Sequence, residues 1–147
     1  MLRIVICLAL TASCVVAECN SGWVKFGDLC LAFSDDKLTW FDSLTVCNAL
    51  GGRLVQIESE KKHTWIVDQL KTRGIGDTWT AGSIRYSGEW EWIPTYKKIS
   101  SYKNWAPSEP NNPKIEKCLD LQANQGHRWN DESCFTAAAF ICEKPDK

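Results

Sequence analysis

Apolar residues recur at helical spacing in two stretches of this chain. Thr39 can cap the first helix and Ser59 the second, because each hydroxyl can accept a backbone N–H of the first turn. Glycines follow both stretches and indicate where the helices end. The first apolar face comprises Trp40, Leu44 and Cys47, with Gly51-Gly52 after it; the second comprises Trp65, Ile66 and Leu70, with Gly74 after it.

Short apolar and aromatic runs between turn-forming residues predict strands. Residues 22–33 are interpreted as a hairpin that turns at Gly27-Asp28. Two early helices followed by antiparallel strands give an α+β domain, and 147 residues suit a single one. The further expected strands are 54–57, 78–81, 90–92, 118–121 and 140–142.

The first 17 residues have the pattern of a secretory signal peptide. Arg3 supplies a positive charge, residues 4–10 are apolar, and the small residues 15–17 end the segment, so cleavage is expected after Ala17. The alternative is a membrane anchor, but this apolar run is too short to cross a bilayer, and nothing later could span one. We therefore expect a secreted, extracellular protein whose domain comprises residues 18–147.

Cleavage would leave six cysteines, because Cys7 and Cys14 lie in the signal peptide. An even number in a small secreted chain indicates a disulfide framework, and no CxxC pair suggests zinc. Six cysteines allow fifteen pairings, and the spacing does not choose among them. No thiol is left over for an intermolecular bridge, so any self-association would be non-covalent. The six are Cys19, Cys30, Cys47, Cys118, Cys134 and Cys142.

Charge and residue chemistry argue against two classes of function. After loss of Arg3, 16 basic residues face 18 acidic ones, and no basic stripe interleaves with aromatics, so nucleic acid is not an expected partner. His63 lies on the predicted second helix and His127 in a loop, with no nucleophile elbow or HExxH motif nearby. We interpret both histidines as ordinary polar residues and expect no enzyme.

Two clusters of oxygen-bearing side chains lie in the last third of the chain. They offer three carboxylates and two primary amides, the ligands that a hard cation such as Ca²⁺ prefers. Either cluster alone is common in surface turns, so the prediction depends on their combination. The expected calcium ligands are Glu109, Asn111 and Glu116 from the first cluster, and Asn130 and Asp131 from the second.

Two cysteines adjoin these clusters. Glu116 precedes Cys118 by two residues, and Asp131 precedes Cys134 by three. If these cysteines pair, the bridge folds the clusters towards each other, and the ligands converge without any helix supplying one.

The combination resembles the C-terminal half of a C-type lectin carbohydrate-recognition domain, of the mannose-selective Glu-Pro-Asn type. The motifs that carry the resemblance are Glu109-Pro110-Asn111, Glu116 beside a cysteine, and Trp129-Asn130-Asp131 before Cys134. The resemblance implies a C-type lectin-like fold with a long calcium-dependent loop region. It also implies the long-form pairing Cys19–Cys30, Cys47–Cys142 and Cys118–Cys134.

The resemblance further implies how a saccharide is bound. Ca²⁺ would bind two vicinal sugar hydroxyls, and Glu109 with Asn111, and Glu116 with Asn130, would each supply an acceptor and a donor. The Glu-Pro-Asn order implies mannose, glucose, N-acetylglucosamine and fucose, whereas Gln-Pro-Asp would imply galactose. A secreted lone domain of this specificity resembles the soluble pattern-recognition lectins, which implies a role in innate immunity and microbial surface glycans as the expected partners.

Two qualifications accompany this prediction. Members of this family often hold an auxiliary Ca²⁺ with acidic residues in the preceding loop and beside the main site. This chain has Arg85 in that loop, and Asn112 and Lys117 beside the main site, so the acids are missing and we expect a single ion. The alternative function is a C-type-lectin-like domain that binds a protein or another non-sugar ligand, because a fold does not settle function.

The tryptophans have an expected structural role. Trp105 and Trp129 bracket the proposed ion site and are expected to support its loops, while the five others that fall among apolar neighbours are expected in the core. These five are Trp40, Trp65, Trp79, Trp90 and Trp92.

Overall fold

The computed structural model of the chain describes residues 19–146, so the expected signal peptide lies outside the described residues. The element order is β1 (Val24–Phe26), β2 (Leu29–Leu38), α1 (Trp40–Ala49), β3 (Arg53–Leu54), α2 (Glu60–Arg73), β4 (Thr78–Ser83), β5 (Glu91–Trp92), β6 (Lys97–Lys98), β7 (Cys118–Gln122), the 3₁₀ turn η1 (Ala123–Gln125), β8 (Arg128–Glu132) and β9 (Ala138–Pro145).

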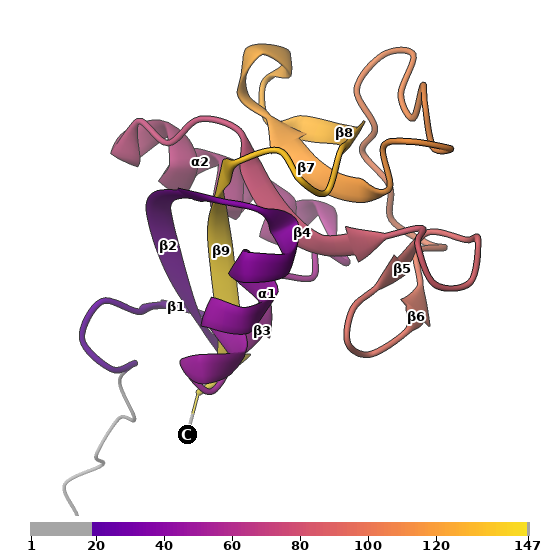
Figure 1. Ribbon diagram of the computed structural model, residues 1–147. Coiled ribbons are helices and arrows are strands. Elements are labelled where there is room, and N and C mark those ends of the chain that lie inside the picture. Colours follow the sequence, from indigo (N-terminus) through magenta and orange to yellow (C-terminus); the bar gives the residue numbers. More distant parts are fainter. Residues whose placement is uncertain (1–18, 147) are drawn as a thin grey trace, which may run out of the picture.

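Within residues 19–146, the strands join into one sheet around β9. The main order is β1-β2-β9-β4-β5-β6, with β3 also beside β9 and the β7–β8 pair attached to β4. In Figure 1, α1 crosses in front of the central strands and α2 lies behind them. The molecule therefore has the α+β architecture that the sequence predicts, with helices on both sides of the central strands.

The two helices begin where the sequence predicts. The Thr39 hydroxyl accepts the N–H of Asp42 at 3.2 Å, and the Ser59 hydroxyl accepts the N–H of Lys62 at 3.2 Å. Gly74 ends α2 in the left-handed conformation, with φ of 65°, which a residue without a Cβ adopts without strain.

The strands differ from expectation in length, number and direction. β3 is confined to Arg53–Leu54. The next residue, Val55, connects two strands: its N–H donates to the Ile141 carbonyl in β9, and its carbonyl accepts the N–H of Ala81 in β4. β6 and β8 were not expected, because polar residues dominate both segments. Most of the described strands pair antiparallel, as expected, but β4 pairs with β9 in parallel, and an isolated parallel bridge joins Trp105 to Trp129.

All three expected disulfides are present. They join Cys19 to Cys30, Cys47 to Cys142 and Cys118 to Cys134. Cys47–Cys142 closes the widest loop, 95 residues, and fastens α1 to β9; loops of this size stabilise a fold by about 4–5 kcal/mol on the chain-entropy model.

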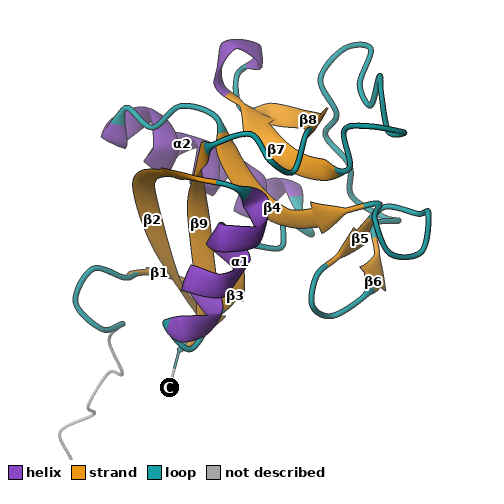
Figure 2. Ribbon diagram, in the orientation of Figure 1, coloured by secondary structure: helices purple, strands orange, loops and turns teal. Residues whose placement is uncertain are grey.

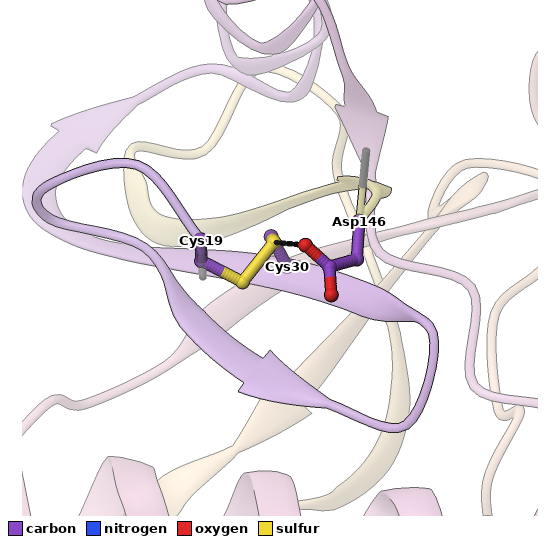
Figure 3. Close-up of side chains that lie close together, drawn as sticks. All are labelled: Cys19, Cys30 and Asp146. Carbon is purple, nitrogen blue, oxygen red and sulfur yellow. Dashed lines mark hydrogen bonds between the residues drawn. A yellow bond between two sulfur atoms is a disulfide. The ribbon is translucent and has the colours of Figure 1, made fainter. Parts of the chain in front are cut away.

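The Cys19–Cys30 bridge lies beside the carboxylate of Asp146, whose Oδ1 is 3.7 Å from the Cys30 sulfur (Figure 3). Three potential ligands gather here, but both sulfurs are consumed in the disulfide and offer no thiolate to a metal. Asp146 instead pairs with Lys25. This cluster is therefore a fastening between the N-terminal hairpin and the end of β9.

Tryptophans make up much of the core, as predicted, but in two classes. Trp40, Trp79, Trp92 and Trp129 are fully buried. Trp65, Trp90 and Trp105 are only partly buried and pack against the edge of the core. No helix among the described residues is both long enough and apolar enough to span a membrane.

Candidate functional site

The β7–β8 hairpin positions the second oxygen cluster. Asp131 lies opposite Leu119, and Asn130 opposite Asp120, in an antiparallel register that the Cys118–Cys134 bridge closes at one end. The Asn130 side chain lies beside Asp120 on β7, and the Asp131 carboxylate contacts the loop that precedes β7. Both are nearly completely buried.

Asp131 holds the long loop between β6 and β7 in place. Its Oδ1 accepts the backbone N–H of Asn111, and its Oδ2 accepts the backbone N–H of Asn112, both at 2.9 Å. This loop runs without helix or strand beside β7 and β8 (Figure 2). A buried carboxylate on the hairpin therefore brings the first cluster to the second.

Glu109 and Asn111 lie side by side in this loop, on either side of a proline whose preceding peptide bond is cis. The Asn111 side-chain amide donates to Glu109 Oε1 at 3.0 Å, and its backbone N–H donates to Glu109 Oε2 at 3.1 Å. The Glu-Pro-Asn motif thus presents a carboxylate and an amide as one unit at the surface, because Asn111 is exposed.

The charges of several carboxylates act on one another in this region. Burial, followed by the hydrogen bond and the negative charge of Asp131, raises the pKa of Glu109, and the charge of Glu116 adds to the shift. Burial and the charges of Asp131 and Glu132 raise the pKa of Glu116. Like charges disfavour ionisation, whereas a divalent cation among them would favour it. The chemistry of the donors therefore suits a hard cation: Glu109, Asn111 and Glu116 would hold it from the loop and Asp131 from β8.

Hydrogen bonds connect three of the five expected ligands, Glu109, Asn111 and Asp131. Among the described residues, no such bond joins the side chain of Glu116 or Asn130 to these three; the Asn130 amide nitrogen instead donates to Asp120 Oδ1 at 3.0 Å. This contact directs the amide nitrogen of Asn130 towards Asp120, on the strand that pairs with β8.

Asp120 is a site residue that the sequence analysis missed. Burial raises its pKa to about 8, even though the hydrogen bond from Asn130 acts in the opposite direction. A carboxylate between Leu119 and Leu121 in an apolar strand was the signal that could have identified it, because acids are seldom buried without a partner.

A buried polar network supports the site from beneath. His63 is buried, with 2% of its surface exposed. Its Nδ1 lies 2.8 Å from the Tyr102 hydroxyl and 2.9 Å from the Asn104 amide nitrogen. Its Nε2 lies 2.8 Å from the carbonyl oxygen of His127. Nε2 must donate to that carbonyl, so Nδ1 is the acceptor. Both histidines are therefore buried polar residues, and their contacts join α2 to the long loop and to the start of β8.

Trp129 connects this network to the loop. Its indole contacts the rings of Trp92, Tyr102 and Trp105 at centroid distances of 5.6–5.7 Å. Its backbone N–H donates to the Asn104 carbonyl, and its own carbonyl accepts the N–H of Ala106. Trp105 and Trp129 thus support the loops around the site, as the sequence predicts.

The family relationship follows from comparison with known proteins. The family model described as Lectin C-type domain matches residues 36–144, about three quarters of the chain. The chain is also 30% identical over 141 residues to a perlucin-like protein of Mytilus galloprovincialis, with 92% of this chain and 89% of that one covered. This chain belongs to the C-type lectin domain family.

Other C-type lectin domains extend the comparison. Human CD209 antigen is 32% identical over 128 residues; these cover 86% of this chain but 31% of CD209, so the chain matches about a third of that protein. The carbohydrate-recognition domain of mouse scavenger receptor C-type lectin superimposes with a TM-score of 0.77 at 29% identity and covers 88% of this chain and 98% of that one.

Two further solved structures bear on ligand choice. A complex of SPL-1 with GlcNAc has a TM-score of 0.79 at 29% identity and covers 89% of this chain and 98% of that one. A calcium-independent type II antifreeze protein has a TM-score of 0.77 at 28% identity and covers 88% and 96%. C-type lectin domains are generally carbohydrate-binding domains that typically hold Ca²⁺, and neither family nor fold indicates catalysis.

Proposed function

We propose that this C-type lectin domain binds mannose-type glycans through a Ca²⁺ ion. The ligands would be Glu109, Asn111, Glu116, Asn130 and Asp131, and the sugar would contact the first four. The observation that carries the proposal is the convergence of Glu109, Asn111 and Asp131, three oxygen-bearing residues from two distant segments, joined by hydrogen bonds of 2.9–3.1 Å.

The chemistry follows from the ligand count. Ca²⁺ accepts six to eight oxygens, and when bound it supplies direct coordination of two neighbouring sugar hydroxyls in the positions that the protein leaves open. Each hydroxyl also has a proton to give and a lone pair to share. Glu109 would accept a proton from one hydroxyl while the Asn111 amide donates to its oxygen, and Glu116 with Asn130 would do the same for the other.

The proposed sugar class rests on the order of the motif. The carboxylate precedes the amide in Glu109-Pro110-Asn111, which in C-type lectins is the arrangement for equatorial 3- and 4-hydroxyls, as in mannose, glucose, N-acetylglucosamine and, by equivalent geometry, fucose. The similarity to SPL-1, which was solved with GlcNAc, is consistent with this class.

We propose a single calcium ion. Arg85 and Lys117 bring positive charge to positions where an auxiliary ion would need acids, and the Arg85 guanidinium lies over the Phe41 ring, 5.0 Å from its centroid. A calcium titration should therefore saturate at one equivalent; two saturable protein sites would contradict this point.

A second candidate function deserves a test, because the fold also occurs in a calcium-independent antifreeze protein. In that case the domain would bind a protein or another non-sugar ligand without the cation. The hydrogen-bonded group of Glu109, Asn111 and Asp131 favours the calcium-dependent function, because its oxygens are the ligands that Ca²⁺ prefers.

The setting of the lectin is also a proposal. With the signal peptide expected at residues 1–17, the protein would be secreted and would recognise microbial surface polysaccharide in innate immunity. Weak binding of a single sugar is expected, because few contacts are made to a small polar ligand. Non-covalent self-association could raise the avidity for a repetitive surface.

Retention on mannose resin tests the function. The protein should bind in calcium and elute with chelator or free mannose, while Glu109→Gln should pass through the column. Glu58→Gln is the matched control, because Glu58 is a partly exposed acid that pairs with Lys97 outside the proposed site. Retention that survives the chelator would overturn the proposal.

A further inference from the structure

A cavity lies near the long loop that carries the proposed calcium ligands Glu109, Asn111 and Glu116. It has a volume of about 470 Å³, within the range of ligand-binding pockets, and it lies between the segment that follows β4, the β5–β6 pair and the long loop. Figure 1 shows β5, β6 and the long loop at the same end of the molecule. The apolar part of its wall is formed by Ile84, Trp90, Ile99 and Trp105.

Two partly buried tryptophans dominate this wall. Trp90 and Trp105 meet edge to face with ring centroids 5.0 Å apart, and neither is fully covered by other residues. Broad aromatic surfaces with a few polar groups beside them are the usual lining of sites for small organic ligands, including the apolar faces of sugar rings.

The charged part of the wall is positive on balance. It carries Lys98, Lys103 and Glu89. Lys98 pairs with Glu89 in an exposed ion pair, whereas Lys103 makes no ion pair within residues 19–146. The net charge of these three side chains is therefore positive, and the ammonium group of Lys103 is available to an anionic ligand.

Two residues of the cavity wall are close, along the chain or through a backbone hydrogen bond, to segments that carry proposed calcium ligands. Trp105 is four residues before Glu109, so their Cα atoms are at most about 15 Å apart. The N–H of Ile84, on the other wall, donates at 3.0 Å to the carbonyl of Lys117, the residue after Glu116. A glycan of a few units could therefore place one sugar on the ion and another in the cavity.

We infer that this cavity is a subsite for an acidic sugar unit, one that carries a carboxylate or a sulfate, of the same glycan whose neutral unit is held at the calcium site. The sugar ring would pack against Trp90 and Trp105 while its anionic group pairs with Lys103. The placement of the neutral unit rests on the proposed function, but binding in the cavity itself does not require calcium and is measured separately.

The first experiment compares affinities in calcium for four probes: methyl mannoside, a neutral mannosyl disaccharide, the same disaccharide with a uronic acid as its second unit, and its sulfated form. The acidic probes should bind about two- to fivefold more tightly than the neutral one, the gain expected from one exposed ion pair. The two acidic forms distinguish carboxylate from sulfate as the preferred group. Equal affinity for neutral and acidic disaccharides would overturn the inference.

Substitutions at the cavity test the sign of the charge effect. Lys103→Gln should remove the preference for the acidic probes, and Glu89→Gln should increase it, because one competing carboxylate is lost. Neither should change the affinity for methyl mannoside. Lys97→Gln is the matched control, since Lys97 neighbours Lys98 on β6 but pairs with Glu58 outside the cavity. An acidic preference that persists in Lys103→Gln would overturn the inference.

A second experiment separates this inference from the proposed function. In chelator, methyl glucuronide should shift the indole N–H resonances of Trp90 and Trp105, and these shifts should be lost in Lys103→Gln. If this occurs while methyl mannoside fails to bind in calcium, the proposed function is wrong and the subsite stands. If methyl mannoside binds but the indoles do not respond, the subsite is wrong. Identical shifts with inorganic sulfate alone would indicate an anion site and not a saccharide subsite, and would also overturn the inference.

Discussion

Asp131 accepts the backbone N–H of Asn111 at 2.9 Å, although the two residues are 20 positions apart in the chain. The other oxygen of the same carboxylate accepts the N–H of Asn112, so one side chain fixes two successive amides of the long loop. The protein itself thus orders the Glu-Pro-Asn loop, which lowers the entropic cost that an incoming ion and sugar would otherwise meet.

Because Asp131 accepts both N–H groups, the backbone amides of Asn111 and Asn112 should be protected from hydrogen exchange even when no calcium is bound. In chelator, the amides of Asn111 and Asn112 should exchange slowly, and Asp131→Ala should make both exchange at least tenfold faster, because a lost hydrogen bond of about 1.5–3 kcal/mol no longer opposes opening. Glu116→Ala is the control, since it removes a proposed ion ligand without touching either amide. Equal exchange in both variants would show that Asp131 does not hold the loop.

Acidification should release calcium. Burial and neighbouring carboxylates raise the pKa values of Glu109 and Glu116 in the protein without the ion, so protons begin to compete with calcium at a higher pH than for isolated acids. The Kd for calcium, measured by titration calorimetry, should increase as the pH falls from 7 towards 4.5. A higher calcium concentration at the lower pH should restore sugar binding if competition is the cause, and an unchanged Kd would contradict the prediction.

Asp120 should destabilise the folded protein at neutral pH. Its pKa is raised to about 8 in the fold, so the folded state retains a proton that the unfolded state loses, and stability falls as the pH rises from about 4 to about 8. Asp120→Asn, which keeps an acceptor for Asn130, should therefore raise the free energy of unfolding in chelator by more at pH 8 than at pH 5. The gain at pH 8 should be on the order of a few kcal/mol, since one pKa unit corresponds to about 1.4 kcal/mol.

Chemical denaturation of wild type and Asp120→Asn at the two pH values measures this difference. Glu58→Gln again serves as the control, because a partly exposed carboxylate should show no such pH dependence. A variant that is less stable at pH 8 than wild type would mean that Asp120 is ionised and satisfied in the fold.

His63 should make the domain acid-sensitive through its burial. Burial disfavours the charged imidazole and lowers the pKa of His63. The hydrogen bond to the His127 carbonyl favours the charged form, but this effect is smaller. The unfolded chain therefore gains a proton that the folded state resists, and stability should fall as the pH drops below about 6.5. His127, whose pKa burial also lowers, should contribute in the same direction.

The variant His63→Gln tests the network. It should lose about 1–3 kcal/mol at pH 7, because buried partners on Tyr102 and His127 are left without their hydrogen bonds, and it should show a weaker pH dependence between 7 and 5 than wild type. Tyr102→Phe removes one of these bonds but no ionisable histidine, so it should keep the wild-type pH dependence. Parallel pH profiles for His63→Gln and wild type would exclude this role.

Exchange of the motif should change the sugar preference. In Glu109→Gln with Asn111→Asp, the amide precedes the carboxylate, so the acceptor and donor around the ion are reversed. Galactose should then compete better than mannose for binding to a glycan array, with calcium still required. Unchanged monosaccharide competition in this double variant would count against direct coordination of the sugar by this loop.

Local chemistry in the sequence was sufficient to predict several features of the fold. Thr39, Ser59 and Gly74 delimit the helices because capping depends on side chains within one turn. The pairing of the cysteines could be stated only through the resemblance to a family, and the structure confirms it. The ligand residues could be proposed because the donor chemistry of acids and amides is legible without any coordinates.

The tertiary structure alone decided how those residues are supported. The polar segments Lys97–Lys98 and Arg128–Glu132 are strands because partners elsewhere in the chain complete their hydrogen bonds, which no local pattern records. Asp120 faces Asn130, His63 reaches the carbonyl of His127, and Asp131 holds the loop at Asn111, all through long-range register. The sequence by itself determined which oxygens are available, because that depends on residue type; the fold decided which of them meet and what lies behind them, because separation in space depends on how distant segments pack.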